Sequence, residues 1–175
     1  SGWFELLERI ILVIAIYTLV NLATIRFIVD GASMYPTFET GQYLIINRLN
    51  YTLSTPQRGD VVVFHLPNNT RRDFIKRVIG LPGETIEFRD TQVYINGEPL
   101  YEPYINEPCA EDMCADGIVQ LGEGEYFVMG DNRNQSADSR FFGPIGLDLI
   151  VGEATLRYYP FSDFTWLHRI GLEDE

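Results

Sequence analysis

The sequence contains no cluster of lysine and arginine residues. Acidic residues number 25 and basic residues 13, so the formal net charge is -12 at pH 7. A protein that binds nucleic acid through the phosphates needs basic side chains gathered on one surface. We therefore expect no nucleic-acid partner.

Cysteine and histidine are also scarce, with two of each. Cys109 and Cys114 lie in a stretch rich in Pro, Asp and Glu, and His65 and His168 are remote from them in the sequence. A structural zinc ion needs four such ligands, so we expect no metal site and no cofactor. In an oxidising compartment the two cysteines could close a small disulfide loop, and otherwise they remain free thiols.

Repeats and low-complexity segments are absent as well. Hydrophobic residues make up 46% of the 175 residues and charged residues 22%, which is the composition of a folded protein rather than a disordered one. The length suits one domain with a hydrophobic core, together with an appendage.

One uncharged run stands out near the N-terminus. Between Arg9 and Arg26 the sequence reads IILVIAIYTLVNLATI, which is 16 residues. A helix needs about 20 apolar residues to cross a bilayer; Trp3 and Phe4 extend the run, and the arginines can reach the interface. We predict a membrane anchor helix over residues 1–26, with the lipid bilayer as a partner. A buried helix or a signal-type segment is the alternative, although the run is long for a signal segment and is not followed by a clean cleavage site.

The remainder, residues 27–175, predicts a mainly β body. Its apolar stretches are short, rich in β-branched and aromatic residues, and bounded by Gly, Pro, Asn or Asp. Asn96-Gly97 fits a type I′ hairpin turn, and we expect a β-sandwich or barrel. The predicted strands are Tyr43–Leu49, Asp60–Leu66, Phe74–Ile79, Thr85–Arg89, Gln92–Ile95, Glu125–Met129 and Leu149–Tyr159.

Three segments carry reactive side chains among turn residues. Ser33 lies in GASMYPT, Lys76 in DFIKRVIGLPGE, and Ser136, Asp138 and Arg140 in GDNRNQSADSR. Each segment has an ordinary explanation when taken alone: a turn serine, a lysine that reaches solvent from a strand, and a solvated polar loop. Their chemistry is complementary, however, and this favours a joint role.

A serine hydroxyl is a poor nucleophile and needs a base to accept its proton. His65 ends an apolar run and His168 lies in the tail, so neither is well placed for this role. At an unperturbed pKa of about 10.4, only about one lysine in a few thousand is neutral at pH 7. Burial can lower that pKa by about 3 to 5 units. Apolar residues surround Lys76 in the sequence and predict such burial: Phe74, Ile75, Val78 and Ile79.

The segments resemble the conserved boxes of bacterial type I signal peptidases, which are Ser-Lys membrane proteases. The boxes occur in the family's order, and with the anchor the resemblance covers nearly the whole chain. The matching stretches are Ser33–Thr37, Arg58–Phe64, Lys76–Glu84 and Gly130–Arg140.

The resemblance implies a role for each residue. Ser33 attacks the scissile carbonyl, and neutral Lys76 accepts its proton and later activates the deacylating water. Ser136 falls where the family keeps a hydroxyl that orients the lysine, and Asp138 and Arg140 fall where an ion pair stiffens that loop.

For the oxyanion, the resemblance implies the backbone N–H of Ser33 as a donor. Some members add a side-chain hydroxyl two residues earlier, but that position here is Gly31, as in the Gram-positive-type pattern. The second donor is therefore not identified by the sequence.

The family cleaves signal peptides from exported preproteins after small residues in an Ala-x-Ala pattern. This implies a body on the outer or trans face of a bacterial-type cytoplasmic or thylakoid membrane, with an extended peptide bound by β-augmentation. Bulky residues around the dyad are the expected walls of the substrate pockets: Phe27, Val29, Met34, Phe38, Phe74 and Ile75.

Two other functions remain as alternatives. A soluble self-cleaving repressor-type protease also uses Ser and Lys, but it would lack the anchor and would carry an Ala-Gly or Cys-Gly site, whereas Ala32 is not followed by Gly. A membrane-tethered β domain that binds partners without catalysis is the second alternative. Loss of cleavage on substitution of Ser33 or Lys76 distinguishes the protease from the binding domain.

Overall fold

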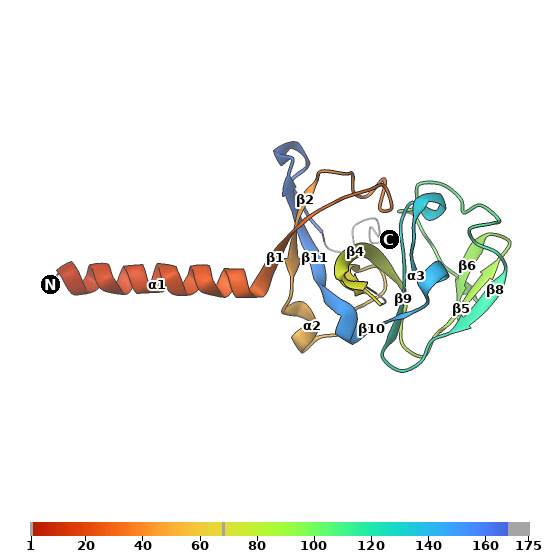
Figure 1. The fold of residues 1–175 in the computed structure, drawn as a ribbon, viewed down its shortest axis with the longest axis horizontal. Helices are drawn as coiled ribbons and strands as arrows, with labels where there is room; N and C mark the ends of the chain where they lie inside the picture. Colours follow the sequence, from red (N-terminus) through yellow and green to blue (C-terminus); the bar gives the residue numbers. More distant parts are fainter. Residues whose placement is uncertain (1, 68, 168–175) are drawn as a thin grey trace.

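The N-terminal helix stands apart from the rest of the molecule. The computed structural model describes residues 2–67 and 69–167, and His168 lies outside them. Helix α1, Gly2–Ala23, extends from the body as a single rod (Figure 1), with none of its residues buried. It is long and apolar enough to cross a membrane, as predicted.

Two polar side chains in the uncharged part of α1 form hydrogen bonds inside the helix. The hydroxyl of Thr18 donates to the carbonyl of Ile14 at 2.8 Å, and the amide of Asn21 donates to that of Tyr17 at 2.8 Å. These bonds suit an environment without water. The helix ends at Ala23, earlier than the predicted boundary at residue 26, because Thr24–Ile28 pairs with a neighbouring strand instead.

The body is mainly β, as predicted, and the described residues form two sheets. The larger sheet has eight strands in the order β1-β2-β11-β3-β4-β9-β10, with β12 paired to β11. Its strands are β1 Thr24–Ile28, β2 Tyr43–Asn47, β3 Val61–Leu66, β4 Asn69–Gly80, β9 Glu125–Met129, β10 Ile145–Gly146, β11 Ile150–Tyr159 and β12 Thr165–Trp166. The smaller sheet, in the order β7-β6-β5-β8, has β5 Thr85–Arg89, β6 Gln92–Ile95, β7 Glu98–Pro99 and β8 Gly117–Gln120.

Side-chain alternation explains how the larger sheet is packed. In β2, Leu44 and Ile46 are buried while their neighbours are only partly so. In β3, Val61–Phe64 is buried throughout because both faces of the sheet are covered. One apolar cluster contains Leu44 and Ile46, and a second contains Val62 and Phe64. The smaller sheet lies at the end of the body farthest from α1 (Figure 1).

The remaining elements are short. Both Asn96 and Gly97 have positive φ, at 51° and 86°, as the predicted type I′ turn requires. Five helical turns complete the described fold: α2 Asn50–Leu53, η1 Arg133–Gln135, α3 Ser139–Phe142, η2 Leu147–Leu149 and η3 Phe161–Asp163.

Candidate active site

Ser33 lies in the loop that joins β1 to β2, and the chain after β9 holds it in place. The backbone N–H of Asn132 donates to the carbonyl of Ser33 at 3.0 Å, and its side-chain amide donates to the carbonyl of Ala32 at 3.0 Å. Met34 and Phe38, with 1% and 0% exposure, anchor the loop in the core. The nucleophile candidate is therefore fixed from both sides while its own side chain stays half-buried.

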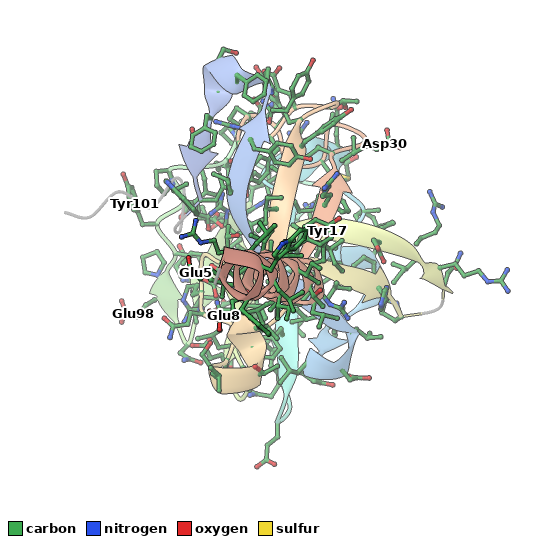
Figure 2. The ribbon with its side chains drawn as sticks, turned by 90° about the vertical axis from the view of Figure 1, so that its left-hand side faces the viewer. Glu5, Glu8, Tyr17, Asp30, Glu98 and Tyr101 are labelled. Carbon is green, nitrogen blue, oxygen red and sulfur yellow. A yellow bond between two sulfur atoms is a disulfide. The ribbon has the colours of Figure 1, made fainter. Side chains whose placement is uncertain are left out.

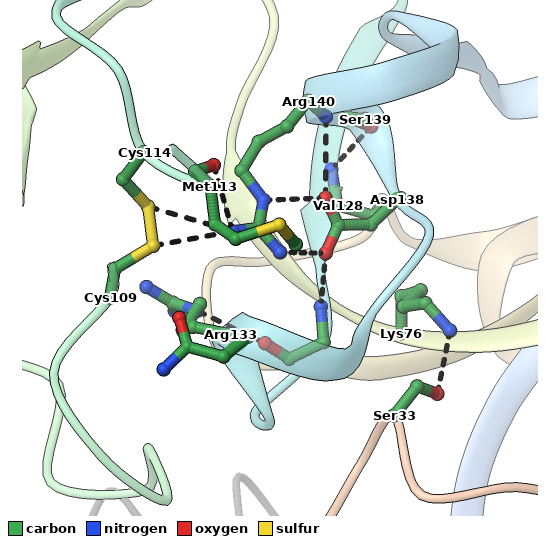
Figure 3. Close-up of polar contacts among 12 residues, drawn as sticks. Ser33, Lys76, Cys109, Met113, Cys114, Val128, Arg133, Asp138, Ser139 and Arg140 are labelled. Carbon is green, nitrogen blue, oxygen red and sulfur yellow. Dashed lines mark hydrogen bonds and ion pairs between the residues drawn. A yellow bond between two sulfur atoms is a disulfide. The ribbon is translucent and has the colours of Figure 1, made fainter. Parts of the chain in front are cut away.

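Lys76 reaches Ser33 from the middle of β4. Its Nζ lies 2.8 Å from Ser33 Oγ and 2.9 Å from the carbonyl oxygen of Ile75. The side chain is 3% exposed, and Nζ lies 5.2 Å from the centre of the Phe74 ring. Figure 3 shows the amine directed at the hydroxyl. The two residues, which are far apart in the sequence, thus meet at hydrogen-bond distance.

Burial changes the acidity of this amine. Loss of solvent lowers the pKa of Lys76 from 10.5 to about 8, with Arg140 lowering it further and Asp138 and Asp131 acting in the opposite direction. At pH 7 about one molecule in ten would then carry a neutral amine, compared with about one in a few thousand for free lysine. Lys76 is also the only lysine in the sequence.

A buried ion pair supports the opposite face of β4. Arg77 donates from Nε and Nη2 to both carboxylate oxygens of Asp131, at 2.8 and 2.7 Å, and both side chains are 0% exposed. The hydroxyl of Thr37 donates to the same carboxylate at 2.5 Å. Because Thr37 follows Ser33 and Asp131 precedes Asn132, this network ties the three chemically important segments together.

Asp138 and Arg140 form the pair that the sequence predicts. The guanidinium donates to the two carboxylate oxygens at 2.8 and 2.8 Å, and Asp138 is fully buried. The same carboxylate accepts the backbone N–H of Gly130 at 3.0 Å and caps α3 through the N–H of Arg140. The pair therefore closes the loop between β9 and α3 at both ends.

Ser136 lies beside Ser33 but does not bond Lys76 here. It is 5% exposed, and its Oγ has no hydrogen-bond partner among the described residues. A Cβ built on Gly130 would collide with both Ser136 Oγ and the carbonyl oxygen of Ser33, so the three groups are in close contact. The orienting bond from Ser136 to Lys76 implied by the resemblance is absent in this structure.

The position two residues before Ser33 offers no side chain. Gly31 has a φ of +94°, which favours glycine, and its N–H donates to Thr40 Oγ1 at 3.1 Å. Thr40 in turn donates to the carbonyl of Gly31 at 3.0 Å. The N–H of Ser33 has no acceptor among the described residues. One backbone donor next to the hydroxyl is therefore unoccupied.

A profile of the family described as "Signal peptidase, peptidase S26" matches residues 3–159. The chain belongs to the signal peptidase family. It is 38% identical over 153 residues to signal peptidase I of Bacillus caldolyticus, which covers 81% of this chain and 82% of that protein. It is 40% identical over 163 residues to probable signal peptidase I-1 of Synechocystis, covering 89% and 81%.

A solved signal peptidase I structure, from Enterococcus faecalis V583, shares the fold. Its TM-score is 0.52 at 40% sequence identity, and the match covers 58% of this chain and 98% of that one. These matches confirm the resemblance seen in the sequence. They also confirm the mainly β body with one N-terminal apolar helix. The chain is a peptidase of this family.

The predicted substrate walls fall into two groups in this signal peptidase. Phe74 packs with the cluster that contains Val62 and Phe64, whereas the other five pack together on Leu44 and Ile46. Four of the six are buried and two are partly exposed. The buried ones are Val29, Met34, Phe38 and Ile75, and the partly exposed ones are Phe27 and Phe74.

Several residues that build the site were not singled out from the sequence. Arg77, Asp131 and Asn132 lie within the family boxes, but their contacts join segments far apart in the chain.

Cys109 and Cys114 are joined by a disulfide in this structure. Within the described residues, no group of three or more His, Cys, Asp or Glu side chains is arranged to hold a metal ion.

Proposed function

We propose that this protein is a membrane-anchored serine endopeptidase that removes signal peptides from exported preproteins, with Ser33 as nucleophile and Lys76 as general base. The observation that carries the proposal is the 2.8 Å contact between a buried amine and a half-buried hydroxyl. A serine is activated only when a base lies within hydrogen-bond reach. The lowered pKa of Lys76, about 8, supplies a base that is neutral in a useful fraction of molecules.

The reaction proceeds in two stages. Ser33 Oγ attacks the scissile carbonyl carbon and its proton passes to Lys76 Nζ. When the peptide C–N bond breaks, Lys76 returns this proton to the departing amine, which leaves the signal peptide as an ester of Ser33. Lys76, neutral again, then takes a proton from water as the water attacks the ester. Hydrolysis frees the signal peptide and restores the hydroxyl.

Negative charge develops on the carbonyl oxygen during both attacks. The N–H of Ser33, which has no acceptor among the described residues, is the proposed donor to this oxygen. Ser136 Oγ, also without a partner there, would turn toward Lys76 Nζ once the peptide is bound. Hydrogen bonds of this kind are often incomplete in an unliganded enzyme and tighten in the complex.

The preprotein would bind as an added strand. On one side of β4, strand β9 pairs only with Arg77, Val78 and Gly80. Among the described strands, the residues of β4 before Arg77 therefore have no partner on that side. An extended peptide along this edge would gain backbone hydrogen bonds and approach Lys76. The six bulky residues already named would leave room only for small side chains, in agreement with the Ala-x-Ala pattern.

The membrane sets where cleavage occurs. α1 would span the bilayer once, and the short stretch from Ala23 to Ser33 keeps the dyad close to the membrane surface. Signal peptides end a hydrophobic segment at this depth. The body would lie on the outer or trans face of a bacterial-type cytoplasmic or thylakoid membrane, where the exported chain emerges.

The test uses the full chain in detergent with a solubilised preprotein. We expect Ser33→Ala and Lys76→Ala each to lower cleavage by at least about a thousandfold, because each removes one member of a cooperating pair. Ser162→Ala is the matched control, since Ser162 is exposed in η3. It should cleave like the wild type.

Gel analysis of the product, with its new N-terminus sequenced, checks the site of cleavage. Cleavage at the wild-type rate by either Ser33→Ala or Lys76→Ala would rule out this mechanism. No cleavage by the wild type would favour the non-catalytic binding domain instead.

A further inference from the structure

Two loops, one of which lies beside the dyad, are joined by several contacts. The first, the catalytic loop, is residues 130–140, which hold Ser136, Asp138 and Arg140. The second, the cystine loop, is residues 107–114, which lie between β7 and β8 and contain no described strand or α-helix. The reaction proposed above assigns no role to the cystine loop.

The first contact is made by Asn134, near the middle of the catalytic loop. Its side-chain oxygen accepts the backbone N–H of Ala110 at 2.8 Å. Its amide donates to the carboxylate of Glu107 at 2.9 Å and to the carbonyl of Pro108 at 3.2 Å. One side chain thus holds three residues of the cystine loop.

The second contact is made by Arg140 at the C-terminal end of the catalytic loop. Nη1 donates to the carbonyl of Met113 at 3.2 Å and lies 3.4 and 3.5 Å from the sulfur atoms of Cys109 and Cys114. Nε and Nη2 of the same guanidinium hold Asp138. Figure 3 shows the cystine on one side of this ion pair and the Ser33–Lys76 pair on the other.

The disulfide closes the loop that carries these partners. Both cysteines are buried, at 7% and 2% exposure, although most of the loop around them is exposed. A short irregular loop loses much of its order when a covalent closure is removed. Met113, whose carbonyl accepts from Arg140, lies between the two cysteines and so within the segment that the bond closes.

We infer that the Cys109–Cys114 disulfide is a positioning device for catalysis, which holds Arg140 and, through Asp138, fixes the catalytic loop against the dyad. The inference rests on the proposed function for its kinetic consequences. Opening the bond would leave Arg140 with its contacts to Asp138 but without its support from Met113 and the two sulfur atoms. The guanidinium and the catalytic loop would then sample more than one position.

The electrostatics of the dyad give this inference a specific signature. The charged groups that act on Lys76 are Asp138 and Asp131, which raise its pKa, and Arg140, which lowers it. A more mobile Arg140 would offset the Asp138 carboxylate less completely. The pKa of Lys76 should therefore rise when the disulfide opens, whereas a bond with a purely structural role would leave this pKa unchanged.

The first experiment measures that pKa without any need for activity. Lysine labelled with ¹³C at the ε position gives one side-chain signal, because Lys76 is the only lysine in the chain. The signal is titrated in full-length protein in detergent, before and after reduction by dithiothreitol, which yields two protein thiols and the cyclic oxidised reagent. We expect the pKa to rise by roughly half a unit on reduction.

The second experiment compares cleavage rates of the same samples. Cys109→Ser/Cys114→Ser and the reduced wild type should show kcat lower by about three- to tenfold, with the acid limb of the pH profile moved to higher pH. Glu111→Gln is the matched control, since Glu111 is exposed in the same loop. Its kcat should equal that of the wild type, and its response to reductant should match the wild-type response. The double variant should not respond to reductant at all.

Circular dichroism identifies a temperature at which the oxidised, reduced and substituted proteins are all folded. Thiol counting shows whether the disulfide is intact or reduced. An unchanged Lys76 pKa together with an unchanged kcat in the reduced, folded protein would overturn the inference, whatever happens to stability. A shifted pKa in a protein whose oxidised form cleaves no preprotein would support the positioning and reject the proposed function.

Discussion

The burial that suits Lys76 to its proposed role as a base also has a cost in folding free energy. An ammonium group that is 3% exposed has lost most of its hydration, and this lowers its pKa to about 8. A difference of this size from the value of 10.5 corresponds to about 3 kcal/mol against the folded state when the amine is charged. We expect Lys76→Met, which fills the same space without a charge, to be more stable than the wild type by up to that amount at pH 7.

The direction of the Lys76 pKa shift determines the pH range over which the stability of the wild type changes. The unfolded chain binds more protons than the folded one between pH 8 and 10.5, so wild-type stability rises with pH across that interval. The stability gained by Lys76→Met is fully present below pH 8 and disappears above pH 10.5. Urea unfolding in detergent at several pH values measures the difference between the two proteins. Equal stabilities at pH 7 would show that the amine pays no desolvation cost.

The dyad and the Asp138–Arg140 pair could be predicted from the sequence, but the other residues that support the site could not. Ser33, Lys76, Asp138 and Arg140 lie in recognisable local motifs, and the structure brings them together. Asn134 carries no such signal, because its partners in the cystine loop lie more than twenty residues away. Ser136 was assigned a bond to Lys76 that the structure lacks, since the rotamer of a serine is set by packing rather than by sequence.

Strand β4 presents two consecutive basic residues to opposite faces of the sheet. Lys76 points to Ser33, and Arg77 points to Asp131 and the carbonyl of Gly59. This follows from the two-residue period of a strand. One element thereby places the proposed base and, on its other side, secures the loop that holds the proposed nucleophile.

The buried pair on β4 can be tested by a double substitution. Arg77→Met leaves the Asp131 carboxylate, at 0% exposure, without its bidentate partner and should cost about 3 to 5 kcal/mol of stability. Arg77→Met/Asp131→Leu removes both charges and should recover a large part of that loss. Thermal unfolding of the three proteins measures this. A double variant no more stable than Arg77→Met would show that the charge left unpaired is not the cause.

At the scale of elements, the sequence was most informative where strands are long and buried. Each of the seven predicted strands has a counterpart, from β2 to β11. The first three residues of β1 were assigned to the predicted anchor, because Thr24 and Ile25 continue the uncharged run and only pairing with β2 makes this stretch a strand. The two-residue strands β7, β10 and β12 are too short to show a period and depend on their partners.

The whole molecule has a face that surrounds the base of the anchor. Seen along α1, the helix projects onto the middle of the body, which extends beyond it in every direction (Figure 2). A cavity of about 850 Å³ lies there, lined by residues of the helix end, α2 and β12. Large apolar side chains stand exposed on nearby elements: Leu49, Leu53, Phe161, Phe164 and Trp166. Aromatic residues at this level are typical of a membrane–water interface.

If this face rests on the bilayer, Trp166 should sense the lipid. Trp166 is 70% exposed and lines the same cavity as Ala23 and Thr24. Since the sequence has two tryptophans, Trp3→Phe leaves Trp166 as the sole indole. In vesicles, its fluorescence should be quenched by lipids brominated near the headgroup more strongly than by lipids brominated near the chain ends.

The control moves the indole to the far end of the body. Tyr101 is 72% exposed and lines a pocket together with Gln92 and Val93 of β6, a strand that lies at the end of the body away from α1 (Figure 1). In a chain carrying Trp3→Phe, Trp166→Phe and Tyr101→Trp, the brominated lipids should have little effect. Equal quenching at both positions would argue for a body that tumbles freely on its tether. If the brominated lipids do not quench Trp166, the face around α1 does not contact the bilayer. The dyad would then also be held away from the bilayer.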